Sequence, residues 1–228
     1  MRAVRRRTAA AALALAAAAG LAGCGSDGGG NGGGGSAAGT ACDGIVRTGD
    51  AEALLDEGAK ASYRLDRQLD AAQQPGLQLL DCSVEAGKGL GLTVRLTGSE
   101  TPAGGLRAPA PPAGEPVYTL GLGDRGGATR WGADLTFRCD GSYLRAGAKA
   151  LYFTVQAGPT PPAGGGEQAA SPRWTPQAWA RLAAATAERA ARGPLGCKAA
   201  VDWPTGDPVL TPASPTDGAT ATPSGTAA

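Results

Sequence analysis

Residues 174–193, WTPQAWARLAAATAERAARG, carry the strongest structural signal in the chain. Thr175 is suited to cap a helix, Pro176 fits its first position, and Trp174 and Trp179 are spaced as a hydrophobic staple. One side of the predicted helix carries apolar or small residues, namely Trp179, Leu182, Ala183, Thr186 and Ala190. The other side carries charged residues, namely Arg181, Glu188, Arg189 and Arg192. We therefore predict an amphipathic helix that packs on a sheet and ends at Gly193-Pro194.

Strand-like segments precede this helix. In residues 90–96, Leu92, Val94 and Leu96 alternate with polar residues, which is typical of a strand with one buried face. Further strands are predicted over residues 77–85, 117–122, 133–139 and 150–156, with a hairpin turn at Gly87-Lys88-Gly89. Residues 98–115 and 158–171 are rich in Gly and Pro and are predicted to be long loops.

A second helix is predicted near the start of the domain. Asp50 is a suitable N-cap, and apolar residues recur at helical spacing as far as Leu69, before Gln74-Pro75-Gly76 ends the pattern. Together these segments predict an α+β fold, in which an antiparallel sheet of about five strands carries two packed helices. The folded unit spans residues 41–203, a normal size for one domain.

The segments on both sides of this domain have a different composition. Residues 24–40 are Gly-rich and contain no apolar side chain larger than Ala, apart from Cys24, so they are predicted to be a flexible tether. Residues 204–228 form a Pro, Thr and Ala tail with few bulky apolar residues, and this tail is predicted to be disordered.

The N-terminus has the organisation of an export signal. Four arginines among the first seven residues precede an apolar segment, residues 9–21, which is too short to span a bilayer. The sequence Leu21-Ala22-Gly23-Cys24 resembles the lipobox of bacterial lipoproteins. This resemblance implies that residues 1–23 are a signal peptide and that the Cys24 thiol carries diacylglycerol. The protein would then be anchored on the extracytoplasmic face of the cell membrane. The alternative is an ordinary secretory signal followed by an unrelated cysteine.

The other four cysteines are Cys42, Cys82, Cys139 and Cys197, an even number that fits two disulfides in an oxidising compartment. Four cysteines allow three connectivities, and sequence alone does not choose among them. We favour Cys42–Cys82 and Cys139–Cys197, because each pair brackets one half of the domain. A zinc site is the alternative, but no two cysteines are closely spaced and the chain has no histidine. We predict no metal and no cofactor.

The composition also limits the chemistry. Without histidine, Ser–His–Asp and Cys–His arrangements are excluded, and the acidic residues show no spacing that marks a catalytic pair. Residues 121–126 match the pattern GxGxxG, but another strand is expected after them, so we interpret them as a hairpin turn and not as a dinucleotide site. The nominal net charge is +1, and loss of the signal arginines makes it slightly acidic, which argues against nucleic acid as a partner.

Aromatic residues are the remaining binding candidates. Trp131, Trp203 and Tyr118 would be suited to line a small-molecule or glycan site if their side chains were exposed. The alternative is packing in the core, as the staple explains for Trp174 and Trp179.

A family resemblance adds to this interpretation. It is carried by Cys42-Asp43-Gly44, the strand with Cys82-Ser83-Val84, the turn with Leu120-Gly121, the strand Leu135-Thr136-Phe137-Arg138-Cys139 and the Ala-rich final helix. In this order they resemble a group of uncharacterised secreted or lipid-anchored envelope lipoproteins of high-GC actinomycetes. The resemblance implies an envelope location and two cysteine pairs, and it supplies no catalytic residues.

We therefore expect a non-catalytic cell-envelope lipoprotein that binds an envelope protein partner. A lipoprotein that binds a small molecule or a glycan is the alternative hypothesis. That alternative predicts a concave pocket near Trp131, Trp203 or Tyr118. An inhibitor or immunity protein that exposes one of the two long loops is a third hypothesis, which nothing in the sequence selects.

Overall fold

The computed structural model describes residues 39–67, 78–86, 90–102, 111–140, 151–160, 170–198 and 201–213. The predicted signal peptide, Cys24 and all but the end of the tether lie outside these ranges, as do residues 214–228 of the predicted tail.

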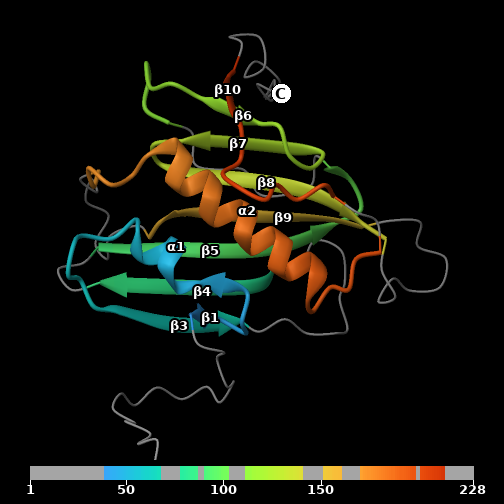
Figure 1. The fold of residues 1–228 in the computed structure, drawn as a ribbon, viewed down its shortest axis with the longest axis horizontal. Helices are drawn as coiled ribbons and strands as arrows, with labels where there is room; N and C mark the ends of the chain where they lie inside the picture. The colour runs from blue at the N-terminus through green and yellow to red at the C-terminus, as the bar shows by residue number, and fades with distance from the viewer. Residues whose placement is uncertain are drawn as a thin grey trace, which may run out of the picture. The chain divides into compact units, whose positions relative to one another are not determined.

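The centre of the fold is an antiparallel sheet of eight strands, ordered β10-β6-β7-β8-β9-β5-β4-β3 (Figure 1). The first three strands in sequence order are β3 (Ala61–Arg67), β4 (Gln78–Ala86) and β5 (Leu90–Ser99). They are followed by β6 (Tyr118–Leu120), β7 (Arg125–Thr129), β8 (Gly132–Cys139), β9 (Leu151–Pro159) and β10 (Leu210–Pro212). A separate two-stranded sheet pairs β1 (Thr40–Ala41) with β2 (Val46–Arg47).

Two helices accompany the sheet, α1 (Thr48–Glu52) and α2 (Pro176–Arg192). The second is the helix that the sequence predicts: the Thr175 hydroxyl accepts a hydrogen bond from the Ala178 amide at 3.1 Å. The ring centroids of the staple residues Trp174 and Trp179 are 5.9 Å apart. All five residues of the predicted apolar stripe are fully buried. The α+β class is therefore confirmed.

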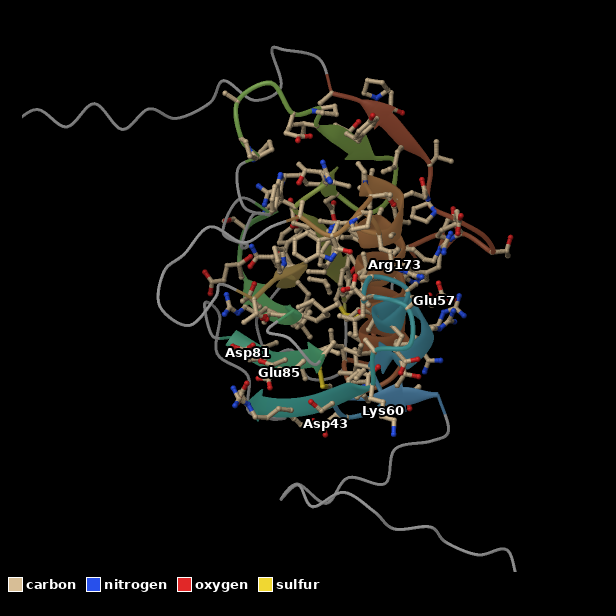
Figure 2. The ribbon with its side chains drawn as sticks, turned by 90° about the vertical axis from the view of Figure 1, so that its left-hand side faces the viewer. Asp43, Glu57, Lys60, Asp81, Glu85 and Arg173 are labelled. Atoms are coloured by element: carbon tan, nitrogen blue, oxygen red, sulfur yellow. A yellow bond between two sulfur atoms is a disulfide. The ribbon has the colours of Figure 1, made fainter. Side chains whose placement is uncertain are left out.

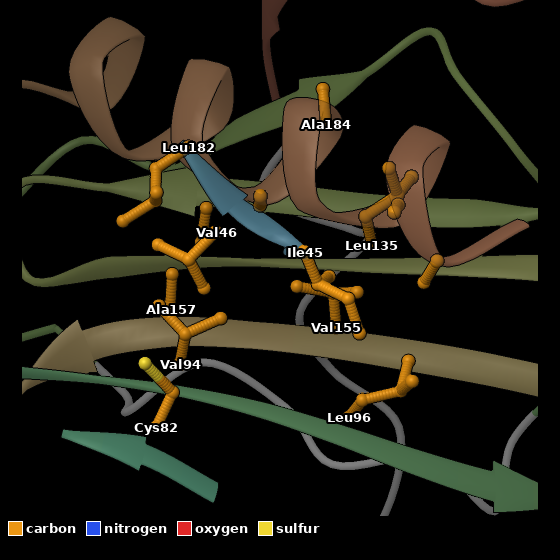
Figure 3. Close-up of a cluster of buried hydrophobic side chains, with 14 of the residues drawn as sticks. Ile45, Val46, Cys82, Val94, Leu96, Leu135, Val155, Ala157, Leu182 and Ala184 are labelled. Atoms are coloured by element: carbon orange, nitrogen blue, oxygen red, sulfur yellow. The ribbon is translucent and has the colours of Figure 1, made fainter. Parts of the chain in front are cut away.

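One face of the sheet packs against α2. Leu135, Val155 and Leu96 stand opposite one another on β8, β9 and β5, and all three are fully buried. Leu182 points from α2 toward these strands, whereas Ala184 lies on the opposite side of the helix (Figure 3). Alternation along each strand places the apolar residues on this face.

The opposite face of the sheet carries polar residues. Thr136 and Thr154 are fully buried there, and their hydroxyls hydrogen-bond across the strands at 2.8 Å. Asp81 and Glu85 on β4 lie on the same face, away from α2 (Figure 2). Buried polar side chains lower the stability of a fold unless they form hydrogen bonds such as this one.

Two disulfides link the sheet to its flanking segments. Cys42 bonds to Cys82, with Cα atoms 5.9 Å apart, and Cys139 bonds to Cys197, with Cα atoms 5.0 Å apart. This is the connectivity that we favoured. The second bridge joins the chain that leaves α2 to the end of β8.

Three strands of the eight-stranded sheet, and the short pair β1 and β2, differ from the sequence predictions, and the sheet is larger than the five strands expected. The predicted first helix ends at Glu52, Asp50 lies in its first turn and not at its N-cap, and residues 61–67 form β3. Ala61 and Leu65 are four residues apart, which fits a helix, but Tyr63 between them completes the period of two of a strand. Gly58 (φ +73°) separates the two elements. The rest of the predicted helix, beyond Arg67, lies outside the described residues.

Strands β7 and β10 were also missed. β7 contains Gly126, where a Cβ would come within 2.8 Å of the Leu120 Cβ, so glycine is needed for the close approach of β6 although it disfavours strands. β10 lies in the segment predicted to be disordered, and it pairs with β6 through its backbone. A strand of three residues is too short to show an alternating side-chain pattern.

Candidate functional site

The three aromatic residues proposed from sequence lie in different environments. Trp131 is in the β7–β8 turn, where its half-buried ring meets Trp174 edge to face with centroids 5.9 Å apart. Tyr118 is half-buried on β6, opposite Ala128 on β7. The half-buried ring of Trp203 meets Phe137 edge to face at 5.6 Å. Trp203 lines a cavity to which neither Trp131 nor Tyr118 contributes.

We call this cavity, of about 400 Å³, the α2 groove, because its floor is the outer side of α2. Arg181, Ala184, Ala185 and Glu188 form the floor. One wall is formed by Arg47 and Asp50, from β2 and α1, and the other by residues 203–208. Ala184 is only 6% exposed although it faces away from the sheet, since the two walls enclose it.

The sequence of α2 makes this hollow. The two adjacent alanines, Ala184 and Ala185, stand one turn after Arg181 and one turn before Glu188. Because an alanine side chain is a single methyl group, the floor is low between two long charged side chains. The outer face of α2 is otherwise charged. The two alanines between Arg181 and Glu188 are therefore the sequence feature that could have indicated a site.

The first wall is held in place by hydrogen bonds to α1 and the loop after it. The Tyr63 hydroxyl on β3 lies 3.1 Å from the Glu52 carboxylate. The Trp174 indole N–H donates to the Leu54 carbonyl at 3.0 Å. Arg173 and Glu57 form an ion pair at 3.3 Å on the surface of the same region (Figure 2). These contacts position a helix of five residues that would not be stable by itself.

The second wall is fastened to α2 and to the sheet. The Arg181 guanidinium donates to both carboxylate oxygens of Asp207, at 2.8 and 2.6 Å. The Gln177 amide donates to the Pro208 carbonyl at 3.0 Å, and β10 pairs with β6 beyond it. The Cys139–Cys197 bridge joins the chain to β8 six residues before Trp203. The groove is therefore bounded by backbone that is attached at several points.

Asp50 is the unusual polar group of the groove. Its side chain is half-buried, and its Oδ2 atom is fully buried without a hydrogen-bond partner. Burial raises the pKa of this carboxyl, and the charges of Arg47, Arg181 and Arg189 oppose that rise. A buried carboxylate oxygen without a hydrogen bond lowers the stability of the folded protein. The accessible part of the same side chain lines the groove.

The other charges of the groove are already paired. The hydrogen bond from Arg181 lowers the pKa of Asp207, and Glu188 forms an ion pair with Arg192 at 3.1 Å. Among the described residues, the exposed Arg47 side chain forms no hydrogen bond or ion pair, although its charge acts on Asp50. Asp50 and Arg47 are thus two opposite charges in the groove that stay available to a ligand.

The GxGxxG segment forms the predicted hairpin turn between β6 and β7, and no helix follows it. Gly123 has φ +70°, and a Cβ there would lie 2.5 Å from the Thr136 carbonyl oxygen, so this turn requires glycine. Asp124 closes the turn by accepting a hydrogen bond from the Arg138 amide at 2.7 Å. These glycines serve the backbone, and they offer no helix N-terminus to a phosphate.

Sequence reasoning found Trp203 but missed Asp50 and Arg181 as parts of a site. It assigned Asp50 to a helix cap and Arg181 to a solvated helix face. Among the described residues, no helix is long and apolar enough to cross a membrane, and no three acidic or Cys side chains are grouped as metal ligands. Comparisons with protein-family models, with curated proteins and with solved structures find no match for this chain.

Proposed function

We propose that this protein is a non-catalytic binding protein of the cell envelope, anchored through a lipid on Cys24, and that the α2 groove is its ligand site. The observation that carries this proposal is the α2 groove itself, with Trp203 in one wall and the Asp50 carboxylate in the other. Small-ligand sites are concave, largely preformed and equipped with a few polar groups of this kind.

The compartment is supported by two independent features. The disulfides Cys42–Cys82 and Cys139–Cys197 are typical of oxidising, extracytoplasmic compartments. The lipobox-like Leu21-Ala22-Gly23-Cys24 sequence then explains retention at the membrane. The Gly-rich tether that follows would let the domain reach ligands away from the bilayer.

Binding fits the groove better than hydrolysis. Hydrolysis of a glycosidic bond by carboxylates needs a second carboxylate beside the acid, free to act as a nucleophile or a base. Both Asp207 oxygens accept from Arg181, and Glu188 is paired with Arg192. Asp50 therefore stands without a free carboxylate partner among the groove residues.

The anchor is tested by Cys24→Ala. We expect the variant to leave the membrane fraction while its thermal unfolding stays unchanged, because the tether separates the anchor from the domain. Cys42→Ala with Cys82→Ala is the matched control, since it removes cysteines from the domain and should leave the protein in the membrane. Membrane retention of the Cys24 variant would contradict the anchor.

The binding function is tested by thermal-shift screening of the mature chain against small molecules of several chemical classes. Stabilisation by one class supports the proposal, because a ligand that binds only the folded state raises the unfolding temperature. The absence of any stabilising compound would contradict it. The protein-partner hypothesis stays a prediction, and in-cell crosslinking followed by mass spectrometry tests it.

A further inference from the structure

We propose that the α2 groove selects a neutral, hydroxyl-rich ligand, a saccharide, with Asp50 as the hydrogen-bond acceptor and Trp203 as the apolar surface. This inference rests on the proposed binding function and deepens it by naming the class of ligand. It draws on three properties of the groove, namely its charge balance, its unsatisfied acceptor and its aromatic wall.

The charge balance disfavours ions of either sign. Arg181 is paired with Asp207, and Glu188 with Arg192, so Arg47 and Asp50 are the remaining opposite charges of the groove, and they attract each other. A cationic ligand at Asp50 would meet the charges of Arg47 and Arg189. An anionic ligand at Arg47 would face Asp50 across the same small cavity. A neutral polar molecule avoids both repulsions.

The unsatisfied acceptor calls for a donor. Asp50 Oδ2 is buried and lacks a hydrogen bond, and no Arg in the groove supplies one. A ligand hydroxyl can donate to the part of the Asp50 carboxylate that lines the groove and at the same time accept from the Arg47 guanidinium. Sites that hydrogen-bond a ligand hydroxyl reject analogues that lack it, because the buried protein group is then left unpaired. Vicinal hydroxyls, as on a sugar ring, present both functions side by side.

The indole of Trp203, in one wall of the groove, is suited to pack against the apolar face of a sugar ring. The face of an indole carries negative charge and attracts C–H groups, which line the apolar side of a pyranose ring. Trp203 is half-exposed in the groove and is oriented by its edge-to-face contact with Phe137. The volume of about 400 Å³ lies in the range of small-ligand sites and has room for a sugar of one or two rings.

The experiment is calorimetric titration of the mature chain, in micelles of a detergent without a sugar headgroup. The neutral probes are maltose, cellobiose, mannobiose and N,N′-diacetylchitobiose, and the charged probes are glucosamine and glucuronate. We expect at least one neutral disaccharide to bind and neither charged probe to bind more tightly. Asp50→Ala should weaken that binding at least tenfold, and Trp203→Ala should abolish it.

Matched controls separate the groove from the rest of the surface. Asp56→Ala removes an exposed carboxylate just after α1, and Tyr118→Ala removes a half-buried aromatic side chain outside the groove. Both should leave the affinity within twofold of the unaltered protein. Asp50→Asn checks that a loss of binding does not arise from misfolding, because an isosteric amide preserves the shape of the wall.

The possible results are distinct. Binding of charged probes alone overturns the saccharide inference and leaves a ligand groove in place. Neutral-sugar binding that survives both groove variants also overturns it, because the sugar would then bind elsewhere. If no probe in this titration binds, the saccharide inference fails, and the wider thermal-shift screen alone then decides the binding function.

Discussion

The two sides of α2 differ in a way that separates stability from binding. On the inner side Trp179, Leu182 and Ala183 are fully buried against the sheet, and the Trp179 indole N–H donates to the Arg130 carbonyl at 3.0 Å. On the outer side two alanines form the floor of the groove, and the neighbouring Asp50 has a buried oxygen without a partner. The inner side is filled and hydrogen-bonded, whereas the outer side has space and an unmet hydrogen bond.

This difference indicates what each side contributes. Well-packed interfaces with all hydrogen bonds formed stabilise the folded state. Open sites contain groups that lower the stability of the free protein and gain their interactions only when a ligand binds. Substitutions on the inner side should therefore reduce stability, and substitutions on the outer side should reduce affinity with little change in stability. Four variants test this division, in order of expected effect.

Trp179→Ala should have the largest effect, a loss of about 3–5 kcal/mol in the free energy of unfolding, because it empties a fully buried site. Urea denaturation measures it. Trp203→Ala is the comparison, and its half-buried ring should cost clearly less. Equal losses would contradict the division between the two sides.

Removal of the second disulfide, by Cys139→Ala with Cys197→Ala, should lower stability by about 2–4 kcal/mol and also weaken ligand binding. This bridge joins the chain to β8 six residues before Trp203, in the second wall. The matched variant, Cys42→Ala with Cys82→Ala, should lose similar stability and keep more of the affinity. If both pairs affect binding equally, the wall is not held by the Cys139–Cys197 bridge.

Asp207→Asn should weaken binding more than it weakens folding. It disrupts the two-fold hydrogen bond with Arg181 that holds the second wall to α2, but the pair lies on the exposed surface, where ion pairs contribute little. Calorimetric titration and thermal unfolding measure the two quantities. The lowered pKa of Asp207 adds a second signature. Its stabilising contribution is present above the unfolded-state value of 3.8 and is lost as the pH falls through the folded-state pKa.

Asp50→Asn should have the smallest effect on stability and a distinct dependence on pH. Because burial raises the pKa of Asp50, the folded state holds its proton more tightly than the unfolded state. The unaltered protein should therefore lose a little stability as the pH rises from 3.8 through the folded-state pKa, and the variant should not. Denaturation between pH 3.5 and 6 measures the difference, and superimposable profiles would contradict the burial of this carboxyl.

The sequence predicts the inner side of α2 well and its outer side poorly. Thr175, Pro176 and the staple act within a few residues, so local patterns report them, and the strands with strict alternation are found for the same reason. β3 was assigned to a helix because Ala61 and Leu65 are also four residues apart. β7 was missed because its glycines leave no alternating pattern, and β10 because a strand of three residues is too short to show one.

The groove could not be predicted as a site because it depends on tertiary structure. Asp50, Arg181 and Trp203 come from three segments far apart in the chain. Each one alone has an ordinary explanation as a cap, a surface charge or a packed aromatic residue. Only the folded chain shows that Arg181 is already occupied by Asp207 while Asp50 is not.

The most direct test of the account is a titration followed by the indole N–H signals of the four tryptophans in a ¹⁵N-labelled chain. The neutral disaccharide with the largest heat of binding is the ligand to add. We predict that the Trp203 signal moves with saturation while those of Trp174 and Trp179, on the inner side, stay in place. Saturable movement of the other signals with Trp203 unchanged would contradict binding in the α2 groove.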